Sequence, residues 1–114
     1  MQYLRQLDRE ALELAVGRHA QDLLDDNLGV THSKVMCIKT EPGGGSPEGL
    51  HSHEWDQLFY VVSGTLTIEI EGENELYEAG PDTLVCYPQG VRHRNWNKTS
   101  SPVVHLAINM SPLS

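Results

Sequence analysis

The sequence predicts a small, mostly β protein, built as one antiparallel sandwich or barrel of about seven short strands. Three observations support this fold class. The chain has 114 residues, a length that suits one compact domain. Short apolar and β-branched runs alternate with turns that contain glycine or proline. Only one stretch, near the N-terminus, has apolar residues at helical spacing.

The stretch from Asp8 to Asp26 predicts an α-helix. Asp8 suits an N-cap, and apolar residues from Leu12 to Leu24 recur at helical spacing. Asn27 and the glycine two positions later would end the helix. We therefore expect residues 1–30 to form an N-terminal helical segment whose apolar stripe packs against the barrel or a partner, and residues 31–114 to form the β-barrel.

The remaining elements are expected to be strands. The alternation from Thr65 to Glu71 places Leu66, Ile68 and Ile70 toward a core and the threonines and glutamates toward water. Ser63-Gly64 is typical of a hairpin turn. The other strands are expected at residues 33–40, 57–62, 75–78, 83–88, 91–97 and 103–110.

Composition excludes some classes of function. Sixteen acidic residues against eight basic ones give a net charge of −8, which argues against nucleic-acid binding. No run of about 18 apolar residues predicts a membrane helix, and the N-terminus lacks the apolar core of a secretory signal. Cys37 and Cys86 lie far apart in apolar runs and are expected to be buried free thiols. We expect a cytoplasmic protein.

Three histidines predict a metal site. His51 and His53 are separated by one residue, so on an extended chain both side chains point to the same face. His93 lies on a later predicted strand and can complete the set. Three neutral imidazoles that converge suit a divalent transition metal and leave coordination positions for water or substrate.

The histidines belong to two motifs. In the first, five residues separate Gly45 from His51-x-His53, and Gln57 and Gly64 follow after gaps of three and six residues. The second reads Pro88-x-Gly90, two residues, His93, three residues, Asn97. Together they resemble the two signature motifs of the cupin superfamily. The resemblance implies a jelly-roll β-barrel, a homodimer, and a metal held by His51, His53, Gln57 and His93.

The chain departs from the family pattern at two positions. Gln57 stands where most metal-binding cupins have glutamate. A neutral amide oxygen is a weaker donor than a carboxylate, so Gln57 either ligates weakly or binds a water or substrate beside the metal. The glycine that opens the second motif should fall at Asp82, but the nearest glycine is Gly80. This second change is expected to alter a turn.

Strand alternation selects the residues around the metal. Phe59 and Val61 share a face with Gln57 and are expected to line the pocket, and Asn95 and His105 are further candidates. Arg92 and Arg94 are expected on the face opposite to His93, which argues against an anion clamp there. Tyr87 and Trp96 are expected to serve in packing rather than in substrate stacking. Two carboxylates, Glu54 and Asp56, are either a general base or ordinary exposed loop groups.

The functional prediction is a small metalloenzyme that acts on a small, oxygen-rich metabolite. The imidazole set accepts iron, manganese, zinc, nickel or copper and does not select among them. A redox-active ion implies a dioxygenase, and zinc or nickel implies an isomerase or lyase. The HSHxxxQ pattern is also similar to that of small cupins of pectin degradation. The alternatives are a metal-free cupin whose histidines bind a ligand directly, and a non-catalytic module that binds or senses a small molecule.

Overall fold

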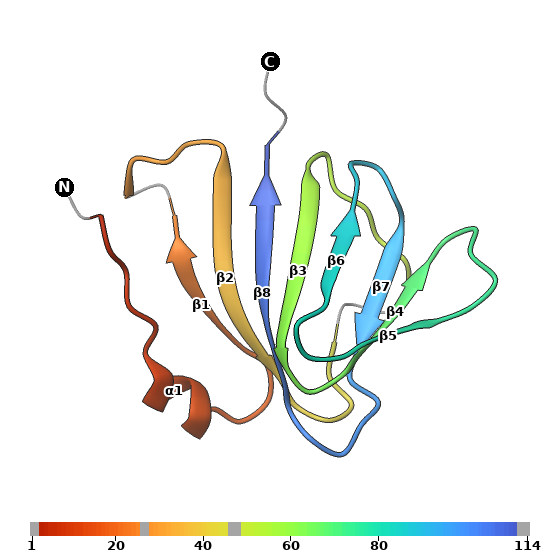
Figure 1. Cartoon of the computed structure of the whole chain (residues 1–114), viewed down its shortest axis with the longest axis horizontal. Coiled ribbons are helices and arrows are strands. Elements are labelled where there is room, and N and C mark those ends of the chain that lie inside the picture. The colour runs from red at the N-terminus through yellow and green to blue at the C-terminus, as the bar shows by residue number, and fades with distance from the viewer. Residues whose placement is uncertain (1–2, 26–27, 46–48, 112–114) are drawn as a thin grey trace.

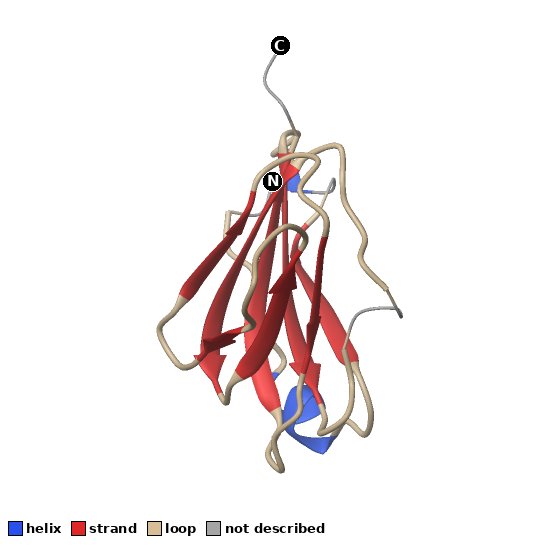
Figure 2. Ribbon diagram, turned by 90° about the vertical axis from the view of Figure 1, so that its right-hand side faces the viewer, coloured by secondary structure: helices blue, strands red, loops and turns tan. Residues whose placement is uncertain are grey.

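The computed structural model describes residues 3–25, 28–45 and 49–111 as one short helix and two antiparallel sheets. The five-stranded sheet has the order β1-β2-β8-β3-β6, and the three-stranded sheet has the order β5-β4-β7 (Figure 1). The two sheets face each other as the layers of a flattened barrel (Figure 2). The bounds are α1 Arg9–Leu14, β1 His19–Leu24, β2 Ser33–Thr40, β3 Asp56–Ser63, β4 Leu66–Ile70, β5 Tyr77–Ala79, β6 Leu84–Tyr87, β7 His93–Trp96 and β8 Val103–Met110.

The all-β class with one N-terminal helix is confirmed, but the helix is much shorter than predicted. It begins as expected, with the carboxylate of Asp8 accepting a hydrogen bond from the third residue beyond it. It ends at Leu14, and Gly17 follows with a φ of +80°. The Lys39 ammonium donates to two carbonyls at this end of the helix, at 3.0 and 3.1 Å, and so satisfies acceptors that lack a helical partner.

The second half of the predicted helix is strand β1. Residues His19–Leu24 pair antiparallel with β2, so the backbone groups there are satisfied across the sheet. The predicted helical stripe is therefore wrong. Leu12 is buried, but Val16 and Ala20, two further members of the stripe, are exposed. The spacing of apolar residues in this segment is compatible with a helix and with a strand. Pairing with the edge of β2 makes it a strand.

The turn at Ser63-Gly64 connects the two sheets and is not a hairpin. Strand β3 pairs with β6 and β8, whereas β4 pairs with β5 and β7 in the other sheet. Gly64 has a φ of +80°, and a Cβ added there would lie 2.9 Å from the Cα of Val103. Strands β4 and β5 pair antiparallel, with Leu66 opposite Ala79.

Two burial predictions are wrong. Thr67 is fully buried although alternation placed it toward water, because it lies between Glu78 and Trp96 on the neighbouring strands, and its hydroxyl donates to the Glu78 carboxylate at 3.0 Å. Cys86 is exposed, because β6 is an edge strand and Cys86 lies on its outward face. Cys37 is buried and both thiols are free, as expected.

The apolar core is formed by residues of both sheets. Leu66 and Ile68 of β4 are buried in it, as the alternation predicted. Its members are Ile38, Phe59, Val61, Leu66, Ile68, Ala79, Tyr87, Val103 and Ala107. No helix of the described part of the chain is long and apolar enough to span a membrane. The expected homodimer stays a prediction.

Candidate metal centre

Backbone pairing places His51 beside His93. The two residues form an isolated antiparallel bridge, in which each amide donates to the other's carbonyl, at 2.9 and 2.8 Å. His53 lies two residues further on, so its ring returns to the same side. The ring centroids are 4.5 Å apart for His51 and His93, 5.2 Å for His51 and His53, and 5.6 Å for His53 and His93. One candidate ligand atom from each ring lies within 4.8 Å of the others. This spacing allows all three to bind one ion.

The surroundings of His93 favour a metal ligand. Its Nδ1 donates to the carbonyl of Val91 at 3.0 Å, which leaves the lone pair on Nε2. That Nε2 is buried and has no hydrogen-bond partner among the described residues. The ring of Tyr87 stacks on the imidazole with centroids 3.6 Å apart and planes 7° apart, which restricts its orientation. A held ring with an unused, buried lone pair fits a metal ion.

Burial and neighbouring charge favour the neutral form of His51 and His93. Burial lowers the pKa of His93, and the neighbouring histidines lower it further, against the opposing effect of the Val91 hydrogen bond. Burial also lowers the pKa of His51, and His53 adds to this effect. The neutral form is the one that binds metal.

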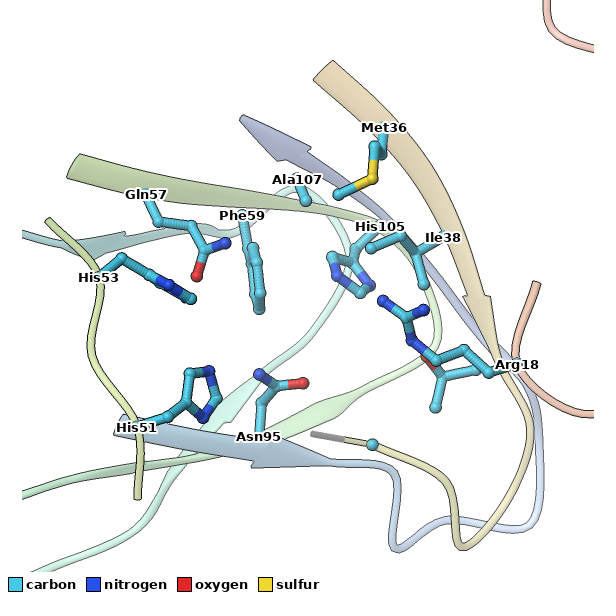
Figure 3. A pocket seen from close by; sticks show the side chains of 12 residues that line it. Arg18, Met36, Ile38, His51, His53, Gln57, Phe59, Asn95, His105 and Ala107 are labelled. Carbon is cyan, nitrogen blue, oxygen red and sulfur yellow. The ribbon is translucent and has the colours of Figure 1, made fainter. Parts of the chain in front are cut away.

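Gln57 presents its amide oxygen to the same space. It lies on β3 opposite Asn109 of β8, and its Nε2 donates to the Asn109 Oδ1 at 2.8 Å. The Gln57 Oε1 is buried without a partner and turned into the cavity beside His53 (Figure 3). This arrangement provides a neutral oxygen donor near the three imidazoles. Whether Gln57 ligates the ion stays a prediction.

A cavity of about 580 Å³ extends from the histidines into the barrel. Of the predicted pocket residues, Phe59, Asn95 and His105 line it, together with His51, His53 and Gln57. Val61 instead lies wholly buried in the apolar core and does not line the cavity. A volume of this size admits a small metabolite.

The two arginines that alternation placed on the face opposite to His93 do not line the cavity. Arg92 pairs with Glu71 at 2.8 Å, and Arg94 pairs with Glu69 at 3.2 Å and stacks over Trp96. Of the two loop carboxylates, Glu54 is exposed, and Asp56 is exposed and accepts the backbone N–H of residue 89 at 2.8 Å. Neither is among the cavity-lining residues. The positions of these two carboxylates therefore do not support a general-base role.

Sequence reasoning missed four residues that shape the site. Tyr87 was predicted to pack, but its stacking on His93 was not. Val91 accepts a hydrogen bond from His93 two residues along the chain. The Gln57–Asn109 hydrogen bond depends on the register of β3 and β8, which the motifs do not contain. Arg18 lines the cavity, yet it fell inside the predicted helix. Assigning residues 19–24 as a strand would have placed Arg18 directly before β1 rather than within a helix.

The fold and site define a small β-barrel protein with a cluster of three histidines. Residues 36–109 match the cupin domain family, and the chain belongs to that family. A search of curated proteins finds no match to the sequence.

Solved structures agree with this assignment. An RmlC-like cupin family protein with a double-stranded β-helix fold from Methanocaldococcus jannaschii superposes with a TM-score of 0.77 at 15% identity, over 97% of this chain and 92% of that one. The polyketide cyclase RemF from Streptomyces resistomycificus gives 0.74 at 21% identity, over 83% and 66%. A sugar phosphate isomerase from Silicibacter pomeroyi gives 0.71 at 23% identity, over 84% and 60%. At these identities the likeness concerns the fold alone.

Proposed function

We propose that this cupin is a small metalloenzyme in which His51, His53 and His93 hold one divalent transition-metal ion. The observation that carries the proposal is the convergence of three ring nitrogens within 4.8 Å, with the Nε2 of His93 buried and otherwise unpartnered. When bound, the ion would supply Lewis-acid chemistry to an oxygen of the substrate. Gln57 would accept a hydrogen bond from a substrate hydroxyl or a water through its free amide oxygen.

The favoured reaction is isomerisation or elimination on a small, oxygen-rich metabolite. The cavity suits a molecule of that size. Structural neighbours described as a sugar phosphate isomerase and a polyketide cyclase support a redox-neutral reaction. The site also accepts iron, and a dioxygenase reaction is the second branch of the same proposal.

One observation favours a non-catalytic module that binds or senses a small ligand. None of the residues that line the cavity in the described part of the chain is a carboxylate. His105, the lining histidine outside the cluster, has its pKa lowered to about 4, mainly by burial. It is therefore a weak base near neutral pH, and proton transfer lacks a strong protein base.

Metal analysis tests the proposal first. The full-length protein, loaded with zinc and desalted, is expected to retain about one ion per chain, as three-histidine sites do. His51→Ala and His93→Ala should each weaken zinc binding by more than about 100-fold, because loss of outer partners alone costs 10–100-fold. The matched control is His32→Ala, which removes an exposed imidazole away from the cavity. Full retention of zinc by the first two variants would disprove the ligand set.

Oxygen uptake then separates the two reaction branches. The protein is reconstituted anaerobically with Fe(II) and mixed with candidate hydroxy-carbonyl compounds, and oxygen consumption and product formation are followed. Turnover with zinc and without oxygen consumption supports the isomerase or lyase branch. Oxygen consumption that depends on both iron and substrate supports the dioxygenase branch. Tight, saturable binding without turnover under either condition favours the binding module.

A further inference from the structure

Arg18 provides a positive charge at the end of the cavity away from the histidine cluster. It lies between α1 and β1, lines the cavity, and directs its guanidinium toward His105 (Figure 3). Three other arginines, Arg5, Arg92 and Arg94, each pair with a carboxylate. Arg18 forms no such ion pair within the described ranges. Its charge therefore remains available to a ligand.

His105 lies next to this charge and lacks partners. It is 2% exposed, its ring packs on Phe59 with centroids 4.4 Å apart, and neither ring nitrogen has a hydrogen-bond partner among the described residues. Burial and the Arg18 charge lower its pKa to about 4, so the imidazole is neutral at pH 7 and offers one N–H donor. A buried donor without an acceptor costs free energy that a ligand can recover.

We propose that Arg18 and His105 form a carboxylate-binding subsite, opposite the histidine cluster, and that the substrate is a small carboxylate with a second oxygen group at the metal. The proposal rests on the metal-dependent function above and names its substrate class. The guanidinium fork matches the two oxygens of a carboxylate, and the His105 N–H adds a third donor. The single fixed charge of Arg18 neutralises a carboxylate, whereas a phosphate monoester would bring a second, unmatched negative charge.

The cavity geometry supports a ligand that bridges the two ends. Figure 3 places His51, His53 and Gln57 at one end and Arg18 with His105 at the other. Apolar and amide side chains lie along the cavity between the two ends. The lining residues carry no acidic group in the described part of the chain, so a bridging anion meets no like charge.

Calorimetric titration of the zinc-loaded full-length chain tests the subsite. The probes are malonate, succinate and glutarate, with glycerol phosphate and the matching diols for comparison, and zinc content is measured after each titration. The wild-type protein is expected to bind one dicarboxylate of the series best and the diols weakly. Arg18→Gln should weaken that binding about 10- to 100-fold, the range for a hydrogen-bonded charge pair, with zinc content unchanged. Arg18→Lys should retain part of the affinity.

The matched control is Arg9→Gln, which removes the same charge from the same N-terminal segment but does not line the cavity. It should bind the dicarboxylate as the wild type does. His105→Phe, checked for folding by circular dichroism, should also weaken binding. Equal affinity in the Arg18→Gln and Arg9→Gln variants, or tighter Arg18-dependent binding of glycerol phosphate, would overturn the proposal.

The subsite and the metal centre can fail separately. If the wild-type protein holds no zinc, the proposed function fails. The subsite is then tested on the metal-free protein by NMR, where glutarate should shift the His105 ring signals in the wild type and in Arg9→Gln but not in Arg18→Gln. If zinc binds and no dicarboxylate does, the subsite fails and the metal centre stands.

Discussion

Burial of His105 should make the stability of this protein depend on pH in a defined window. The imidazole lies in the barrel interior, and burial, aided by the Arg18 charge, lowers its pKa from 6.5 to about 4. Between these two values the unfolded chain binds a proton that the folded protein does not bind. The free energy of unfolding therefore falls as the pH drops from about 6.5 to about 4, and it rises in the opposite direction.

The magnitude follows from the size of the pKa change. One pH unit corresponds to about 1.36 kcal/mol, so His105 alone should cost the folded state about 3 kcal/mol at pH 4 relative to pH 7. His51 and His93 also have lowered pKa values and act in the same direction. A substitution that removes only the His105 titration separates its share.

Urea unfolding of the metal-free protein at several pH values from 4 to 7 provides the measurement. His105→Leu replaces the imidazole with an apolar side chain of similar size and should keep most of the stability at pH 7. The difference between wild type and variant should then change by about 3 kcal/mol over the window, to the disadvantage of the wild type at low pH. Parallel pH profiles, or an NMR titration of the folded protein that gives His105 a pKa near 6.5, would refute the reasoning.

Two further substitutions test the surroundings of the site. Gly45→Ala adds a Cβ that would lie 2.6 Å from the Cα of Trp96, so we expect a loss of about 2–3 kcal/mol in urea unfolding, whereas Gly80→Ala, with its nearest atom at 3.9 Å, should be nearly neutral. Gln57→Glu should tighten zinc binding about tenfold or more in a chelator competition, because a carboxylate replaces a neutral oxygen. Gln89→Glu controls for the added charge, and unchanged affinity in Gln57→Glu would place position 57 out of reach of the ion.

The sequence predicted those parts of the fold whose signals are local. Residues 33–40 and 103–110 were expected as strands and are β2 and β8 with the same bounds. The alternation around Leu66 and Ile68 identified the buried face of β4. In each case the side-chain period of two reports directly on burial.

Non-local choices were not predicted. Residues from His19 to Leu24 have a spacing that suits a helix, and only the available edge of β2 makes them a strand. The turn at Gly64 resembles a hairpin in its residues, yet it leads to the opposite sheet because β3 finds its partners in β6 and β8. Sequence spacing carries no information on which strand edge is free.

Asp82 occupies the position where the second motif lacks its glycine. The missing glycine of the second motif was expected to alter a turn. That expectation stays a prediction. Asp82 has a φ of +65°, a left-handed conformation that glycine adopts easily and that aspartate tolerates better than most residues. The carboxylate also accepts a hydrogen bond from the Tyr60 hydroxyl at 2.9 Å. The aspartate therefore holds a conformation that a glycine would also allow at this position.

The change at Gln57 has a different consequence, because it acts together with Asn109 and Arg18 on the charge of the cavity. The Gln57 amide donates to the Oδ1 of Asn109, its cross-strand neighbour. The absence of this carboxylate leaves the lining without a negative group among the described residues, and Arg18 adds a positive one. The whole chain carries a net charge of −8. A cavity of opposite sign inside an acidic protein favours anions at the site itself rather than through long-range attraction to the surface, so ligand affinity should depend more on Arg18 than on overall charge.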